Sequence, residues 1–286
     1  MVYELRDVSV SMNDREVLQS VSCTLQEGKW ISVIGHNGAG KSTFVKVIKG
    51  LIPSFSGEYT INQQPLPRDR KGNMKVVPQI GYVFQNPEQQ IFETTVYKEL
   101  AFALKIRKDH TGNREQEIEA VMKQMELSSD LLNMSPYQLS GGQKRRVAIA
   151  SVLIADPELL ILDEPTAGLD PLSRVALLEQ IKAWQRMKNR TVIFISHQME
   201  DVAEYSDEVM IFNRGRLLVQ MNANELFLQH TAFMEQAGLP LPEPVQLLKL
   251  IEELSGQIIE PASCREEDIM QQVRAVWQAR GVQDDG

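Results

Sequence analysis

Residues 35–43 read Gly-His-Asn-Gly-Ala-Gly-Lys-Ser-Thr and carry residue types that can bind phosphate. Gly35, Gly40, Lys41 and Ser42 have the spacing of a phosphate-binding loop. Glycines allow the backbone to turn tightly and to point N–H groups inward, which makes a concave anion site. Lys41 would reach the outer phosphates of a nucleotide, and the Ser42 hydroxyl would hold Mg²⁺. The alternative is a glycine-rich turn that matches by chance. The predicted nucleotide-binding residues are Gly35, His36, Asn37, Gly38, Ala39, Gly40, Lys41, Ser42 and Thr43.

A pair of acidic residues follows an apolar run later in the chain. Leu-Leu-Ile-Leu at residues 159–162 leads directly into Asp163 and Glu164. A carboxylate at the end of a buried strand beside a phosphate loop can support Mg²⁺, and we assign this role to Asp163. Glu164 is then placed to polarise an attacking water. A strand that merely ends in acids is the alternative, and it is common when such a run occurs alone.

A third motif, Leu-Ser-Gly-Gly-Gln, occupies residues 139–143. Ser140 is a good N-cap for a helix predicted to run to about residue 155. Gly141 and Gly142 would let a phosphate from another molecule approach the exposed N–H groups at the start of that helix. A helix start explains Ser140, but it does not explain Gly141, Gly142 and Gln143 in that order.

Strands and helices must hold these motifs in place. Trp30 to Ile34 is a short apolar run typical of a buried strand, and residues 42–51 have helical spacing, so the phosphates would lie at a helix N-terminus. Helical spacing over residues 95–138 indicates an insertion into the α/β pattern. Other strands are predicted over residues 3–10, 17–25, 57–61, 80–84, 159–163 and 191–196, with a hairpin over 209–221. We also predict a surface loop over 65–73, a charged helix over 171–188, a linker over 239–244 and two terminal helices near 245–254 and 265–280.

Composition narrows the function classes. The 286 residues allow one large domain or two smaller ones, and the net charge of −8 argues against nucleic acid as the main partner. Cys23 and Cys264 are too few for a disulfide framework or a zinc site, so a reducing cytosolic setting is the simplest interpretation. Charges near the N-terminus do not suit a signal peptide, and no apolar stretch approaches the roughly 18 residues of a membrane span. Any membrane role would therefore come through a partner.

From about residue 3 to residue 228, these motifs resemble the ATPase subunit of ABC transporters. The resemblance implies an α/β fold of the P-loop NTPase type, with a mixed or parallel sheet core, an antiparallel β subdomain and a helical subdomain. It implies an ATPase domain over residues 1–238, with the helical subdomain at about 86–158, followed by a short helical extension over 239–286. ATP and Mg²⁺ are the implied cofactors.

The same resemblance implies roles for further residues. Gln85 matches the glutamine that contacts Mg²⁺ and senses the transmembrane partner, and His197 matches the switch histidine at the γ-phosphate. Asp170 matches the end of the D-loop, the segment Ala-Gly-Leu-Asp that lies between the two nucleotide sites of a pair. Met12 stands where the family carries an aromatic residue against adenine, and its thioether can still pack on a purine.

Family motifs therefore predict three sets of site residues. The signature set is Ser140, Gly141, Gly142 and Gln143, which would contact ATP held by the opposite subunit. The catalytic set is Glu164, His197 and Gln85. The Mg²⁺ set is Ser42, Gln85 and Asp163.

Within the family, residues 84–90, reading Phe-Gln-Asn-Pro-Glu-Gln-Gln, residues 143–150 and the tail after Pro240 look like the ATPases of energy-coupling factor transporters. Those systems take up vitamins, cobalt or nickel in prokaryotes. The implied partners are a second ATPase subunit, identical or paralogous, a transmembrane coupling protein and a substrate-binding membrane protein, with no nucleic acid. The implied location is the cytoplasmic face of the membrane, and the substrate is selected by another subunit.

The C-terminal extension is implied to hold the ATPase pair together. Its first helix carries an apolar face made of Val245, Leu247, Leu248, Ile251 and Leu254. The alternative is that this face only packs on its own domain.

Three other functions are weaker matches. A soluble ABC ATPase acting on ribosomes or DNA ends usually fuses two cassettes or inserts long coiled coils, and this chain does neither. An ATPase of another ABC importer or exporter shares the main motifs. A P-loop kinase or GTPase completes its site without the segment at residues 139–143.

Overall fold

A six-stranded sheet lies at the centre of the computed structural model, which describes residues 1–106 and 112–281. The strand order is β10-β9-β3-β8-β7-β6, and all strands except β10 run parallel to one another. Parallel strands end at the same edge, so the loops that follow β3, β6, β7 and β8 meet there. The bounds are β3 (Trp30–Ile34), β6 (Ile80–Val83), β7 (Leu159–Asp163), β8 (Thr191–Ile195), β9 (Glu208–Asn213) and β10 (Arg216–Asn222).

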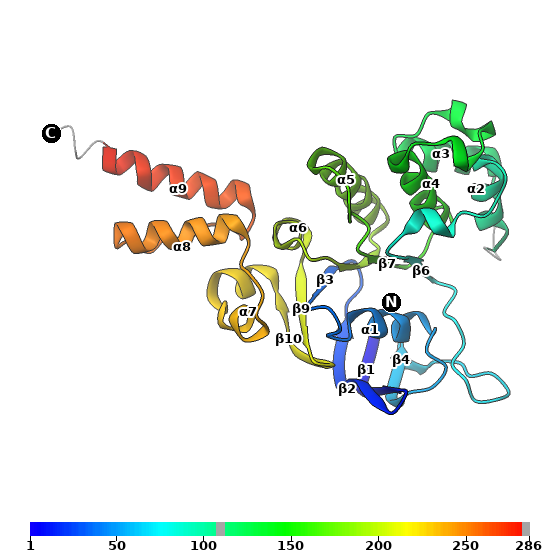
Figure 1. Cartoon of the computed structure of the whole chain (residues 1–286), viewed down its shortest axis with the longest axis horizontal. Coiled ribbons are helices and arrows are strands. Elements are labelled where there is room, and N and C mark those ends of the chain that lie inside the picture. Colours follow the sequence, from blue (N-terminus) through cyan, green and yellow to red (C-terminus); the bar gives the residue numbers. More distant parts are fainter. Residues whose placement is uncertain (107–111, 282–286) are drawn as a thin grey trace.

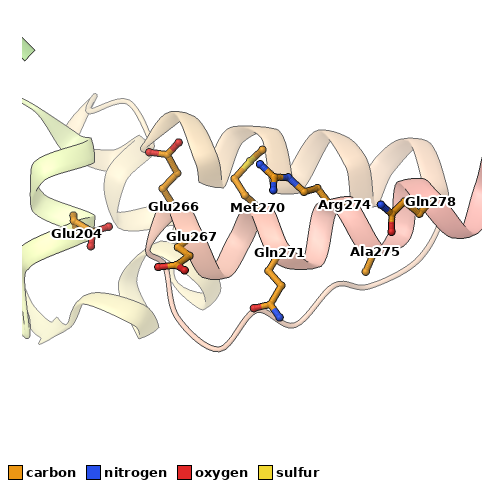
Figure 2. Close-up of a pocket in the computed structure, with 8 residues that line it drawn as sticks. All are labelled: Glu204, Glu266, Glu267, Met270, Gln271, Arg274, Ala275 and Gln278. Carbon is orange, nitrogen blue, oxygen red and sulfur yellow. The ribbon is translucent and has the colours of Figure 1, made fainter.

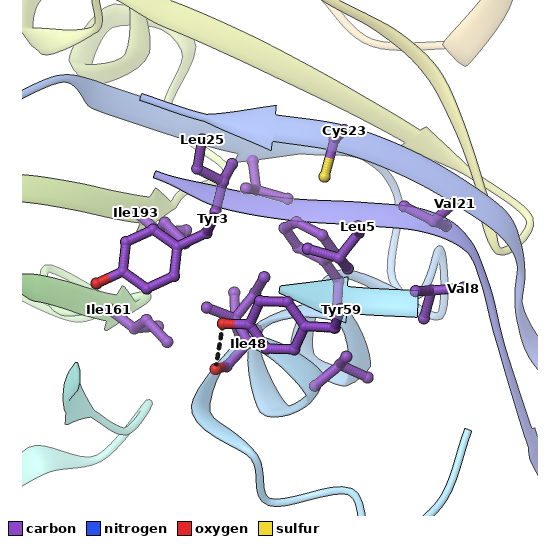
Figure 3. Packing of buried hydrophobic residues seen from close by; sticks show 14 of the residues in the cluster. Tyr3, Leu5, Val8, Val21, Cys23, Leu25, Ile48, Tyr59, Ile161 and Ile193 are labelled. Carbon is purple, nitrogen blue, oxygen red and sulfur yellow. Dashed lines mark hydrogen bonds between the residues drawn. The ribbon is translucent and has the colours of Figure 1, made fainter. Parts of the chain in front are cut away.

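A second, antiparallel sheet and helix α1 (Lys41–Lys49) cover one face of the central sheet. Side chains alternate between the two faces of a strand, so Ile161 and its neighbours on β8 point toward this layer. Figure 3 shows Ile161 and Ile193 beside Tyr3 and Tyr59, whose hydroxyl donates a 2.9 Å hydrogen bond to the carbonyl of Ile48. The antiparallel strands are β1 (Tyr3–Met12), β2 (Arg15–Leu25), β4 (Ser56–Ile61) and β5 (Gln64–Pro65).

Helices cover the opposite face of the central sheet. Leu160 and Leu162 of β7 point to this side, where they pack with Trp30, Phe194 and helix residues in a second buried cluster. The helices of this layer are α2 (Val96–Ile106), α3 (Arg114–Gln124), α4 (Gly141–Leu153) and α5 (Pro171–Lys188). Three 3₁₀ turns accompany them: η1 (Pro87–Gln90), η2 (Ser129–Asn133) and η3 (Pro136–Gln138).

The C-terminal extension forms a helical hairpin at the end of the molecule opposite to α2–α4, and Figure 1 shows α8 (Glu243–Ser255) beside α9 (Glu266–Gly281) there. Buried side chains Val245, Leu248 and Ile251 belong to the same cluster as Ile34 and Val209 of the central sheet. The base of the extension is therefore continuous with the core. Smaller elements complete this side: α6 (Met199–Tyr205), the π-helical turn η4 (Glu225–Gln229) and α7 (Ala232–Ala237).

The predicted fold class is confirmed, and most elements lie where the patterns placed them. The helical segment predicted over 95–138 is broken into α2, α3 and two 3₁₀ turns, and residues 107–111 of it lie outside the described residues. The predicted loop at 65–73 is partly paired, since Pro65 belongs to β5 and Arg68 bridges to Met74. Both cysteines are buried and unpaired. In residues 1–106 and 112–281, no helix is both long enough and apolar enough to cross a membrane.

Candidate active site

The phosphate loop joins β3 to α1 and contains three glycines in the left-handed region. Gly35 has φ 148° and Gly40 has φ 104°. A Cβ atom at Gly35 would collide with the carbonyl oxygen of Phe212, and one at Gly40 would lie 2.8 Å from Leu18 Cδ2. A Cβ at Gly38 would meet no atom within 4 Å. The loop is therefore packed against β9 and β2 on one side and is open at its centre.

The end of the loop and the start of α1 offer N–H groups to an anion. Gly40 is the N-cap of α1 and supplies no side-chain cap, so the first N–H groups of the helix have no intrahelical partner. These groups and the positive end of the helix dipole favour a negatively charged ligand. The geometry fits the predicted phosphate site.

Lys41 lies inside this loop and is only 6 % exposed. Its ammonium donates hydrogen bonds to the carbonyl oxygens of Gly35 at 2.6 Å and His36 at 3.0 Å. Burial lowers the pKa of the Lys41 ammonium from its usual value, and the negative charges of Glu164 and Asp163 partly oppose that change. The cation is held at the centre of the loop, beside two acids.

Asp163 ends β7 as predicted, and the structure adds a partner that the sequence motifs did not indicate. The Tyr82 hydroxyl of β6 donates a 2.9 Å hydrogen bond to Asp163 Oδ2. Burial raises the pKa of the Asp163 carboxyl, the Tyr82 hydrogen bond opposes the rise, and the charge of Glu164 adds to it. The charge of Lys46 and the Ser42 hydroxyl also lower this pKa.

Glu164 joins the other two predicted catalytic residues. The Gln85 side-chain amide donates a 3.0 Å hydrogen bond to Glu164 Oε2, and His197 Nε2 lies 3.0 Å from Glu164 Oε1. Glu164 has φ 52°, an uncommon backbone conformation for a residue with a side chain. Such strain persists where surrounding contacts hold it, often at functional sites. The structure therefore brings together three side chains that are 79 and 33 positions apart, counting 164 − 85 and 197 − 164.

The predicted signature residues lie on the helical layer rather than in the phosphate loop. Ser140 caps α4 by accepting a 3.3 Å hydrogen bond from the Gln143 N–H, and the Gln143 side chain accepts a 3.0 Å bond from the Ser140 N–H. A Cβ at Gly141 or Gly142 would meet no atom within 4 Å. All four residues are exposed and present an open helix N-terminus.

The remaining predicted residues occupy simple structural positions. Asp170 is the N-cap of α5, where its carboxylate accepts a 3.0 Å hydrogen bond from the Ser173 N–H; hydrogen bonds from Ser173 lower its pKa. Met12 ends β1 and is 41 % exposed, and its role against adenine stays a prediction. Asn37 is exposed, Ala39 is buried and Thr43 is half-buried in α1. The His36 ring lies close to Gly238, where a Cβ would be 2.9 Å from Nε2.

Two residues of this region were missed at the sequence level, Tyr82 and Arg145. Tyr82 pairs with Ile161 in the β6–β7 register, so an alignment of the two parallel strands could have indicated it. Arg145 lies in α4 and donates a 2.7 Å hydrogen bond to the carbonyl of Ala167 in the D-loop. No local pattern signals that contact.

Comparisons with known proteins establish the family of this chain. The family model described as ABC transporter matches residues 18–167. The energy-coupling factor transporter ATP-binding protein EcfA2 of Acetivibrio thermocellus is 39 % identical over 245 residues, which cover 86 % of each chain. The protein of the same name from Bacillus subtilis is 36 % identical over 270 residues, 93 % of this chain and 96 % of that one. The chain belongs to the energy-coupling factor family of ABC transporter ATP-binding subunits. As such a subunit, it hydrolyses ATP as the motor of a membrane uptake transporter.

Solved structures share the fold of this ABC ATPase. The cbiO1 protein of Clostridium perfringens, described as part of the ABC transporter complex cbiONQ, is 31 % identical with a TM-score of 0.72. That match covers 86 % of this chain and 98 % of the other. A dimeric ATP-binding cassette in a post-hydrolysis state, bound to ADP and phosphate, is 25 % identical with a TM-score of 0.67, covering 78 % of this chain and 99 % of the other.

Proposed function

We propose that this ATPase works as one half of a pair that closes over two ATP molecules, with Glu164 as the catalytic base in each site. The observation that carries the proposal is the placement of the Glu164 carboxylate between the side chains of Gln85 and His197. Glu164 follows Asp163 at the edge of the central sheet where β7 ends and where the phosphate loop leaves β3. Each carboxylate oxygen is held by one neighbour. The carboxylate is thereby oriented, which is what a base needs to take a proton from an attacking water.

The roles of the three residues follow from their contacts. Glu164 would polarise the water, because it supplies the negative charge of the group. His197 and Gln85 would hold its two oxygens, and both could turn toward a γ-phosphate when ATP is present. Gln85 lies in the short loop between β6 and η1, so a movement of η1 would pull on Glu164 through the Gln85 side chain.

We further propose that Mg²⁺ is held with ATP by Ser42, Asp163 and Gln85. The fit rests on the chemistry of the donors. The exposed Ser42 hydroxyl lies at the start of α1, and the buried Asp163 carboxylate, whose pKa is raised by burial and would fall next to a cation, ends β7. Mg²⁺ usually takes one or two protein carboxylates and substrate phosphates. Consistent with that, the described residues hold no cluster of three or more His, Cys, Asp or Glu side chains suited to a metal. Bound Mg²⁺ would neutralise charge on the phosphates.

The signature set would act on ATP held by the partner subunit. Ser140 and Gln143 satisfy each other, while the glycines between them leave the start of α4 open. A helix start with free approach on its outer side is suited to a phosphate that arrives with another molecule.

Gly141→Trp tests this arrangement. The indole would occupy open space in one subunit, so the fold and ATP binding should be retained, while ATP-dependent pairing should be blocked. ATP titration and sedimentation velocity, run in parallel, measure the two properties. Equal loss of both would show that Gly141 acts within its own subunit.

The C-terminal extension is proposed to take part in pairing through its outer surface. Leu250 of α8 and Trp277 of α9 are 50 % and 62 % exposed, and large exposed apolar side chains of this kind suit a protein contact. A hollow of about 830 Å³ is lined mainly by α9 and also by Glu204 of α6, and Figure 2 shows Met270 and Arg274 among its lining residues.

Membrane partners complete the proposal. A transmembrane coupling protein would bind this ATPase at the cytoplasmic face of the membrane, and a separate membrane protein would bind a vitamin or metal ion. The test is affinity purification of the chain from detergent-solubilised membranes of its own host. Co-purification of two membrane proteins and an ATPase is expected, whereas co-purification of ribosomes would favour a soluble role.

A further inference from the structure

Arg145 connects three segments that carry the motifs of the active site. It lies in α4, four residues after Gly141, and its side chain is 11 % exposed. Its Nη1 donates a 2.7 Å hydrogen bond to the carbonyl of Ala167, which opens the D-loop. Its Nε lies 3.6 Å from Glu88 Oε2 in η1, the turn that follows Gln85.

The two contacts are unequal. The bond to Ala167 has the length of a strong charge-assisted hydrogen bond, whereas 3.6 Å to Glu88 is too long for one. Glu88 Oε2 is buried and has no hydrogen-bond partner among the described residues. A buried carboxylate oxygen without a hydrogen bond is unfavourable. A shift of η1 toward α4 by less than 1 Å would bring Glu88 Oε2 within hydrogen-bond distance of Arg145 Nε. The Arg145–Glu88 contact therefore has a second arrangement, close to the present one, in which the hydrogen bond is formed.

The residue type at position 145 and the geometry of α4 both support a link between η1 and the signature segment. A guanidinium presents several donors in a rigid plane, so Arg145 can serve Ala167 and Glu88 together, which a lysine ammonium does less well. Gly141 and Arg145 belong to the same helix, α4, and lie four residues apart on one face of it. A displacement of Arg145 with the helix would therefore also displace Gly141. A change at η1 would reach the signature segment through this helix.

We propose that Arg145 is a positioning residue that couples the position of η1, and therefore of Gln85, to the signature segment and the D-loop. This inference rests on the proposed action of the signature set on the partner's ATP. Arg145 touches no reacting group. It would set the angle at which the start of α4 meets the other subunit.

The neighbouring residue provides a matched control. Arg146 pairs with Glu126 at 4.0 Å, where the Glu126 side chain is 66 % exposed, so this ion pair includes neither η1 nor the D-loop. Arg145→Met and Arg146→Met remove the same charge from adjacent positions of one helix. Glu88→Gln and Glu126→Gln remove the two partner charges in the same way.

The experiment uses the full-length chain, with its partner ATPase if pairing requires one. For each variant, the melting temperature, ATP affinity without pairing, turnover against ATP concentration and ATP-dependent pairing in a Glu164→Gln background are measured. Arg145→Met should lower turnover and pairing by roughly 2- to 30-fold, the range of mutations within coupling networks, with unpaired ATP affinity retained. Glu88→Gln should act in the same direction, Arg145→Lys should restore part of the loss, and both controls should match wild type.

The outcomes distinguish a failure of the Arg145 inference from a failure of the proposed function of the signature set. If Arg145→Met is folded and matches Arg146→Met in turnover and pairing, the inference is wrong. If Arg145→Met does not fold, Glu88→Gln decides, and wild-type turnover and pairing in that variant would overturn the inference. If Gly141→Trp pairs normally with ATP, the proposed action of the signature set fails first, independently of Arg145.

Discussion

Asp201→Asn should change how the stability of this ATPase depends on pH. Asp201 lies in α6, is 4 % exposed and faces Arg174 Nε at 3.4 Å. Burial raises the pKa of the Asp201 carboxyl from 3.8 to about 6; the charge of Arg174 opposes the rise, and that of Glu200 adds to it. The folded protein therefore holds this proton more tightly than the unfolded chain does.

The magnitude follows from that rise. The rise of the Asp201 pKa from 3.8 to about 6 corresponds to about 3 kcal/mol of free energy, because each tenfold change in proton affinity is worth about 1.4 kcal/mol. Because the pKa is higher in the folded state, its stabilising contribution is complete below pH 3.8 and disappears as the pH rises to about 6. Asparagine does not titrate, so Asp201→Asn should gain stability relative to wild type by up to about 3 kcal/mol across this window.

Urea unfolding at intervals from about pH 3.5 to pH 7.5, which spans the whole window, would measure the difference in free energy of unfolding between the two proteins. Asp14→Asn is the matched control, because it removes the same charge from an exposed turn. Its difference from wild type should be nearly constant over the same range. A constant difference for Asp201→Asn as well would refute the reasoning.

Two further predictions concern nucleotide binding and pairing. Lys41→Ala should weaken ATP binding at least about tenfold, because hydrogen bonds from a charged donor to phosphate contribute roughly 1.5–3 kcal/mol; calorimetry on the folded variant measures this, and wild-type affinity would remove the phosphate loop from the site. Leu250→Glu together with Trp277→Glu should weaken subunit pairing while the melting temperature stays close to wild type, since both side chains are at least half exposed. Gln64→Glu adds a charge to an exposed position of β5, outside the extension, and serves as control; unchanged pairing in the double variant would move the interface elsewhere.

Local patterns predicted most of the fold because they reflect burial and capping. The strand at Trp30–Ile34 and the helix at Pro171–Lys188 have the predicted bounds, since the first is apolar throughout and the second begins with an Asp cap and a proline. The helix α6 was missed because it has only seven residues, too few for a periodic pattern. The start of a separate helix at Arg114, capped by Asn113, was missed because helical spacing is present both before and after this position.

Local motifs indicated the phosphate loop, Asp163, Glu164 and the segment at 139–143, and the family resemblance indicated Gln85, His197, Asp170 and Met12, but neither predicted the contacts of these residues. The contact of Tyr82 with Asp163 depends on which strands are neighbours in the sheet, and the two residues are 81 positions apart. Arg145 reaches Ala167 across 22 positions because α4 packs beside the loop after β7. The apolar face predicted on α8 is divided by the fold: Val245, Leu248 and Ile251 pack on the core, while Leu254 is 57 % exposed.

Glu164→Gln tests the central claim most directly. Glutamine keeps the size of the side chain and can still hydrogen-bond Gln85 and His197, but it has no charge to polarise a water. General-base catalysis contributes about 10²–10⁴-fold, so ATP turnover should fall by that factor. ATP binding should be retained, because Lys41 and the loop N–H groups are unchanged. The variant should then accumulate as an ATP-dependent dimer on size exclusion, alone or with a paralogous partner. Turnover within a few-fold of wild type would place the base elsewhere and contradict the proposed mechanism.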